Sequence, residues 1–142
     1  MADGKNKIDK ETARGEFVRW CEENDIDCNM DAMTDEEKKD FKPMMDRFVK
    51  ACVRGRLEAD GVNLKYTISD FSVPPFKGQT ITVKRPDGHA FIGMDGYKET
   101  QSIHRMNGFI SAMTGQEVAF FAKIDREDWL FFRDVASLFL VG

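Results

Sequence analysis

The sequence predicts an α+β fold that is mainly helical, with about four helices and a small antiparallel sheet made of a hairpin or three strands. Apolar residues recur at spacings of three and four in the N-terminal and C-terminal parts of the chain. Between residues 57 and 85 the apolar period falls to two, as in half-buried strands. A chain of 142 residues with 42% hydrophobic and 32% charged residues is also ordinary for one globular domain.

Two helices are predicted before residue 56. The first runs from about Glu11 to Glu23, and its apolar face contains Ala13, Phe17, Trp20 and Cys21. The second begins at a capping box formed by Thr34 and Glu37 and ends at Gly55. Its apolar stripe comprises Phe41, Met44, Met45, Phe48, Val49, Cys52 and Val53. Pro43 lies inside this pattern and predicts either a kink or a restart of the helix.

Strands are predicted next. Asp60-Gly61 stands between two strand-like runs and indicates a hairpin in which both turn residues have positive φ. Residues 70–78 contain Pro74-Pro75 and predict a loop, and residues 79–85 predict a further strand.

Two more helices are predicted after the sheet. One runs from about Ala90 to Met113 and stops at Gly115, with an inner stripe of Ile103, Met106, Ile110 and Met113. The last runs from about Arg126 to Leu140, with Asp125 as its N-cap. Its apolar residues cover most of its circumference, so we expect it either to be central to the core or to meet another chain.

Composition and charge exclude several classes of function. No apolar run reaches the roughly 18 residues that span a bilayer, and residues 1–16 lack the apolar region of a signal peptide. We therefore expect a cytoplasmic protein without a membrane partner. The net charge of −4 argues against a nucleic-acid partner. The charge is uneven, however, because residues 1–40 carry 13 acids and 7 bases whereas residues 41–65 carry 3 acids and 6 bases. A solvated basic helix face explains that contrast best.

The residue pattern does not favour catalysis. Nucleophile-elbow and phosphate-loop motifs do not occur, and neither His89 nor His104 has a nearby nucleophile or carboxylate at a suitable spacing. We expect no enzymatic activity and no cofactor. The three cysteines are an odd number, which favours buried or idle thiols over disulfides or a zinc site.

The acidic segment Asp25–Glu36 suggests a calcium loop. Asp, Asp, Asn and Glu fall at its first, third, fifth and twelfth places. Met30, however, stands where such a loop needs glycine, and the helix start at Thr34 explains the acidic residues without a metal. We therefore predict no metal site, with a calcium-binding helix–loop–helix regulatory protein as the alternative.

Several short motifs follow one another in a recognisable order. They are residues 36–61, "ITVKRPDG" from Ile81, "MD" at Met94-Asp95, a helix closing in "MTG" at Met113–Gly115, "KIDREDW" at Lys123–Trp129, and "LFL" at Leu138–Leu140. In this succession, over about two-thirds of its length, the chain resembles the tail assembly chaperones of bacteriophages and prophages. The resemblance implies a non-enzymatic viral protein that keeps the tape measure protein soluble in the host cytoplasm and is absent from the mature virion. Residues 1–33 have no counterpart, so we expect an acidic N-terminal helical arm over 1–33 and a single chaperone-like domain over 34–142.

Partner contacts are expected where apolar residues lie in loops or exceed what one core face needs. The candidates are Met30, Met33, Phe71, Phe76, Trp129, Phe131, Phe132 and Phe139. The partner would be the tape measure protein or another tail protein, and the last helix also allows homo-oligomers. A generic protein-binding adaptor is the remaining alternative.

Overall fold

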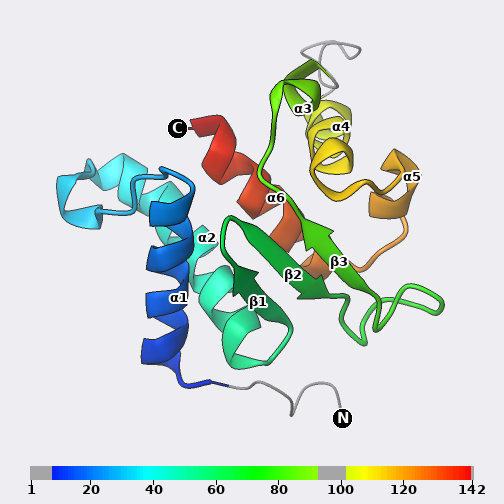
Figure 1. Ribbon diagram of the computed structural model, residues 1–142, viewed down its shortest axis with the longest axis horizontal. Coiled ribbons are helices and arrows are strands. Elements are labelled where there is room, and N and C mark those ends of the chain that lie inside the picture. Colours follow the sequence, from blue (N-terminus) through cyan, green and yellow to red (C-terminus); the bar gives the residue numbers. More distant parts are fainter. Residues whose placement is uncertain (1–7, 93–101, 142) are drawn as a thin grey trace.

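The computed structural model describes residues 8–92 and 102–141, and it confirms a mainly helical α+β fold with a three-stranded antiparallel sheet (Figure 1). The elements in order are α1 (Lys10–Glu23), the 3₁₀ turn η2 (Met30–Ala32), α2 (Asp35–Val53), β1 (Leu57–Asp60), β2 (Asn63–Thr67), β3 (Thr80–Val83), α3 (Gly88–Ile92), α4 (Ser102–Thr114), α5 (Val118–Phe121) and α6 (Arg126–Val141). Within the described ranges, no helix combines the length and the apolar character needed to cross a membrane.

Side-chain caps define where the helices begin. The predicted capping box is present: Thr34 Oγ1 accepts the backbone N–H of Glu37 at 3.1 Å, and Glu37 Oε1 accepts that of Thr34 at 2.9 Å. The Asp125 side chain accepts the N–H of Glu127 at 2.9 Å, in the role predicted for it. Pro43 lies inside α2, which continues through it without a restart.

The hairpin is confirmed, but its turn is displaced by one residue from the prediction. Asp60 pairs with Asn63, so the loop residues are Gly61 and Val62. Gly61 has a φ of 62° and Asp60 belongs to β1. A two-residue turn with glycine at its first position needs only that one positive φ, so the expectation of two was wrong.

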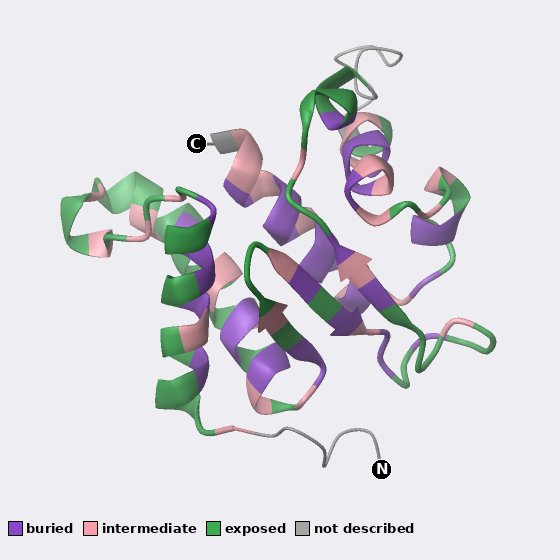
Figure 2. Ribbon diagram, viewed as in Figure 1, coloured by how far each residue is buried: buried purple, intermediate pink, exposed green. Residues whose placement is uncertain are grey.

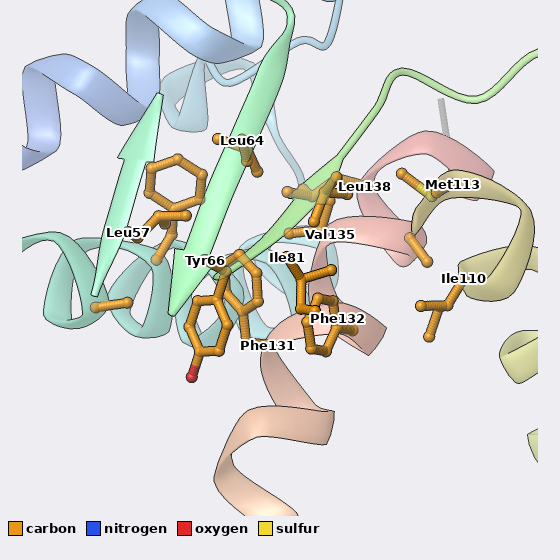
Figure 3. Close-up of a cluster of buried hydrophobic side chains, with 14 of the residues drawn as sticks. Leu57, Leu64, Tyr66, Ile81, Ile110, Met113, Phe131, Phe132, Val135 and Leu138 are labelled. Atoms are coloured by element: carbon orange, nitrogen blue, oxygen red, sulfur yellow. The ribbon is translucent and has the colours of Figure 1, made fainter. Parts of the chain in front are cut away.

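One face of the sheet forms part of the core. Leu64, Tyr66, Ile81 and Val83 are buried on it, while Glu58 and Lys65 on the opposite face are exposed. The pairing of Leu64 with Val83 and of Tyr66 with Ile81 brings the apolar side chains together. The buried side chains of α6 and α4 meet this face, as Figure 3 shows.

The predicted arm over residues 1–33 is not separate from the core of residues 34–142. The inner side of α1 is buried, as Figure 2 shows, and α1 packs against α2 and β1. Phe17 is fully buried, and its ring centroid lies 4.9 Å from that of Phe48 on α2. The buried side chains of α1 belong to the same hydrophobic core as those of residues 34–142. The boundary expected at residue 33 therefore does not separate two cores.

The helices after the sheet differ from the prediction in two respects among the described residues, the exposure of Ile103 and the presence of α5. The part of the predicted helix over residues 93–101 lies outside the described residues. Ile110 and Met113 are buried as expected, but Ile103 is exposed on α4. The short helix α5 was not predicted. Gly115 ends α4 with a φ of 74°, and its N–H bonds to the carbonyl of Ser111 at 2.8 Å.

Candidate functional site

A fully buried carboxylate, Asp128, ties the first turn of α6 to the loop that follows β2. One oxygen accepts hydrogen bonds from the Tyr66 hydroxyl at 2.6 Å and the Ser69 backbone N–H at 3.0 Å. The other accepts the hydroxyls of Ser69 at 2.8 Å and Ser72 at 2.6 Å. We call these four residues the Asp128 network. It supplies four hydrogen-bond donors to a carboxyl group that has no exposed surface.

Tyr66 connects the Asp128 network to the core. Its ring stacks on Phe131 with centroids 4.1 Å apart. Burial and the neighbouring Asp128 carboxylate raise the pKa of Tyr66. The phenol therefore stays protonated, and its O–H donates the hydrogen bond to Asp128.

The same network holds two apolar side chains in solvent. Phe71 and Val73 flank Ser72 and are 66% and 61% exposed. Their loop is anchored at Ser69 and Ser72 by hydrogen bonds to Asp128, and Ser72 Oγ also accepts the N–H of Asp125 at 2.8 Å. The exposed pair is therefore presented on an anchored loop.

Beside this loop lies a cavity of about 530 Å³ between α2 and the start of α6. We call it the basic groove. It is lined by cationic Arg47, Lys50, Arg56 and Arg126, by the carboxylates Asp125 and Glu127, and by Ala51, Tyr66, Phe71, Leu130 and Phe131. Its volume lies within the range of clefts that hold a ligand of drug size.

Ion pairs in the basic groove converge on Glu127. Its Oε1 lies 3.5 Å from Lys50 Nζ, 3.7 Å from Arg54 Nη1 and 3.7 Å from Arg56 Nη2. Arg47 is different, because its Nη1 makes a 2.8 Å hydrogen bond to the buried carboxylate of Asp134. Arg47 thus braces α2 against α6 at the lining of the cavity, and Lys50 and Arg56 line the same cavity beside Glu127.

The structure separates the predicted partner-binding residues into three groups. Phe71 is exposed at the basic groove. Phe76, Met30 and Met33 are partly buried against the core, and the ring of Phe76 meets that of Phe120 with centroids 5.6 Å apart.

The candidates on α6 form the third group, and they are core residues. Phe131 and Phe132 are buried, so assigning them to partner contacts was wrong for this fold. Trp129 and Phe139 are partly buried: Trp129 Nε1 donates to Asn107 at 2.8 Å, and Phe139 packs on Trp20 with centroids 5.6 Å apart. The physical reason is that α6 packs against both α2 and α4 and also meets the sheet through Tyr66, so an apolar surface over most of its circumference is satisfied internally.

Sequence reasoning missed Val73, Arg56 and Glu127. The basic excess over residues 41–65 was a signal for Arg56, but it was assigned to a solvated helix face. The distance along the chain between Glu127 and Lys50 hides their contact. The exposure of three further apolar side chains was also missed: Phe91, Ile92 and Ile103 are 46–67% exposed.

The acidic segment Asp25–Glu36 forms a connection built on local turns. Asp27 and Asn29 side-chain oxygens accept the backbone N–H groups of Asn29 and Asp31 at 3.0 and 3.2 Å. Asp25 adopts a φ of 58°, and Met30 begins η2. In the part of the chain that the structure describes, no group of three or more His, Cys, Asp or Glu side chains is placed to hold a metal ion.

Comparisons of the chain with protein-family models, with curated proteins and with solved structures find no match. Its function is therefore inferred from the groove, the exposed side chains and the sequence resemblance.

Proposed function

We propose that this protein is a non-enzymatic tail assembly chaperone of a bacteriophage or prophage. It binds the tape measure protein in the host cytoplasm while the tail is assembled. The ordered motifs between residues 36 and 140 support this assignment through their resemblance to that family. The α+β fold is compatible with it.

The observation that carries the proposal is the exposed pair Phe71 and Val73 beside the basic groove. A chaperone that keeps a client soluble must offer apolar surface to the client's apolar residues. Contact between an exposed phenylalanine side chain and water is unfavourable, and a partner that buries the side chain gains about 1.5–3 kcal/mol of binding free energy. Because their loop is anchored by Asp128, its backbone loses little conformational freedom on binding.

Co-expression tests this function. The chain is expressed with the tape measure protein, identified as the longest coiled-coil protein encoded nearby, and the soluble fraction of that client is measured. We expect the wild-type chain to increase the soluble fraction and a Phe71→Ser, Val73→Ser double variant to lose most of this effect. Val62→Ser is the matched control, because Val62 is also partly exposed but lies in the hairpin turn.

Two results would contradict the proposal. One is a client whose solubility does not change with the wild-type chain. The other is a double variant that remains folded and acts as well as the Val62→Ser control. If another protein is retained by the Phe71 surface while the tape measure protein is not, the chain is an adaptor for a different client.

A further inference from the structure

The basic groove contains more positive than negative charge at its centre. Lys50, Arg54 and Arg56 all approach one carboxylate, that of Glu127, at 3.5–3.7 Å. These separations lie beyond the 2.7–2.9 Å of a charge-assisted hydrogen bond between an ammonium or guanidinium group and a carboxylate. Glu127 therefore attracts all three cations without satisfying any of them by close hydrogen bonding. The groove has donors left for a second anion.

Arg56 is the most informative of these cations, because it is buried. Its side chain is 9% exposed, whereas those of Lys50 and Arg54 are about half exposed. Its Nε is buried and has no hydrogen-bond partner among the described residues. The nearby carboxylate of Glu127 lies 3.7 Å from Arg56 Nη2, too far for a close charge-assisted hydrogen bond. An incoming carboxylate that reached Nη2 would supply that hydrogen bond.

The position of Phe71 restricts the kind of ligand that fits. The phenylalanine lines the same cavity as Lys50 and Arg56 but is 66% exposed. A ligand that covers both regions must place a carboxylate next to a large apolar side chain. Protein segments in which Asp or Glu alternates with apolar residues have this property. Nucleic acid fits less well, because Asp125 and Glu127 line the cavity and the chain carries a net charge of −4.

We infer that the basic groove recognises an acidic, amphipathic protein segment. A carboxylate of that segment is bound by Lys50 and Arg56, which line the groove, and an apolar side chain beside it covers Phe71. Glu127 acts as an internal competitor, which holds the cations when the segment is absent and weakens its binding. The assignment of this segment to the tape measure protein rests on the proposed function. The recognition of an acidic, amphipathic segment by the groove does not rest on it.

Fluorescence anisotropy with two matched peptides tests the recognition. The probe is a fluorescein-labelled peptide rich in Glu and Leu, and the control peptide has Gln in place of every Glu. We expect the Glu peptide to bind at least about tenfold more tightly than the Gln peptide, with an affinity that falls as salt is added. A Gln peptide that binds equally well, or a labelled oligothymidine that binds more tightly than the Glu peptide, would overturn the inference.

Two variants with the same net charge locate the site. Lys50→Glu should weaken the binding of the Glu peptide about tenfold or more, since it reverses a charge in the groove. Lys42→Glu is the control, because Lys42 lies on the same helix with a similar exposure and does not line the groove. Equal weakening by both variants would show that net charge, and not the groove, attracts the peptide.

Glu127→Gln is the sharpest variant, because it predicts a gain. Removing the internal competitor should increase the affinity for the Glu peptide about threefold to tenfold, while Gln preserves the shape of the side chain. Weaker binding by Glu127→Gln would mean that Glu127 positions the cations for the ligand and does not compete with it, which refutes the competitor role.

The failures of this inference and of the proposed function are distinguishable. If the Glu peptide binds as expected but the tape measure protein stays insoluble on co-expression, the inference stands and the chaperone function fails. If the tape measure protein is kept soluble equally by the wild-type chain and by Lys50→Glu, the chaperone function stands and the assignment of this client to the basic groove fails.

Discussion

Replacing Asp128 by alanine should destabilise the protein more than any exposed substitution near the basic groove. The change removes the acceptor of four hydrogen bonds at a site with no exposed surface. The hydroxyls of Ser69 and Ser72 can rotate toward other acceptors, but the Tyr66 hydroxyl and the Ser69 backbone N–H are held in place. At about 1–3 kcal/mol for each buried donor left without a partner, these two donors predict a loss of about 4 kcal/mol in the free energy of unfolding.

Tyr66→Phe provides the comparison that isolates the network. It removes one donor and keeps the ring that stacks on Phe131, so we expect a loss of about 1–2 kcal/mol. In the Asp128→Ala background the same change should recover about 1–3 kcal/mol, because it removes a buried hydroxyl that has lost its acceptor. The double-mutant cycle should therefore give a coupling free energy of about 2–5 kcal/mol between the two residues.

Urea unfolding, followed by tryptophan fluorescence and by far-ultraviolet circular dichroism, measures these differences. Trp20 on α1 and Trp129 on α6 report on the packing of two different helices. Coincident transitions from the two probes would justify a two-state free energy. A loss below about 1 kcal/mol for Asp128→Ala, or strictly additive effects in the cycle, would refute the claim that the four donors depend on this carboxylate.

Three further predictions concern other parts of the fold. Burial raises the pKa of Cys52 from 9.0 to about 12. The thiol's contribution to stability is therefore complete below pH 9 and is lost as the pH rises toward 12. Between pH 8 and 10, under reducing conditions, the free energy of unfolding of the wild type should fall by about 1.4 kcal/mol more than that of Cys52→Ala. An equal loss in both would contradict the burial of this thiol. Arg47→Ala leaves the buried carboxylate of Asp134 without its 2.8 Å hydrogen bond, and urea unfolding should show a loss of about 1–2 kcal/mol, reduced because Arg133 remains nearby. Gly115→Ala should cost about 1–2 kcal/mol by the same measurement, since Gly115 has a φ of 74° and a Cβ there meets no atom within 4 Å, so the backbone conformation alone is tested.

The elements that sequence reasoning located correctly are those specified by nearby residues. The capping box at Thr34 and Glu37 involves residues three apart, and the hairpin depends on Gly61 between two alternating runs. Such signals are complete within a short stretch of chain. The one error in the hairpin, the position of its turn, came from assigning positive φ to both Asp60 and Gly61.

The role of α6 could not be decided from its own sequence. A helix that is apolar over most of its circumference is equally suited to a core with neighbours on several sides and to a partner's surface. The outcome depends on α1, α2 and α4, which lie far away in sequence. Trp129 illustrates this, because its partner Asn107 belongs to α4. Ile103 shows the converse, since helical spacing placed it on an inner stripe that the fold leaves exposed.

The candidate site was only half visible in the sequence for the same reason. The cations of the basic groove appear as a local excess of charge over residues 41–65, but their carboxylate partner, Glu127, is contributed by α6. Phe71 was identified because it lies in a proline-containing loop, yet the residue that anchors this loop, Asp128, follows Glu127 on α6. Tertiary structure is needed to bring these three features together.

The adjacent residues Glu127 and Asp128 connect the two halves of the site. Asp128 is buried and positions the loop that carries Phe71, while the partly exposed Glu127 sits among the cations of the groove. The first turn of α6 thus determines both the apolar and the charged contact, and it does so through one stretch of backbone. A client segment that displaced Glu127 would act on the same turn that anchors Phe71. The apolar and electrostatic contributions to binding should therefore be coupled, and not independent as they would be for two separate surface patches.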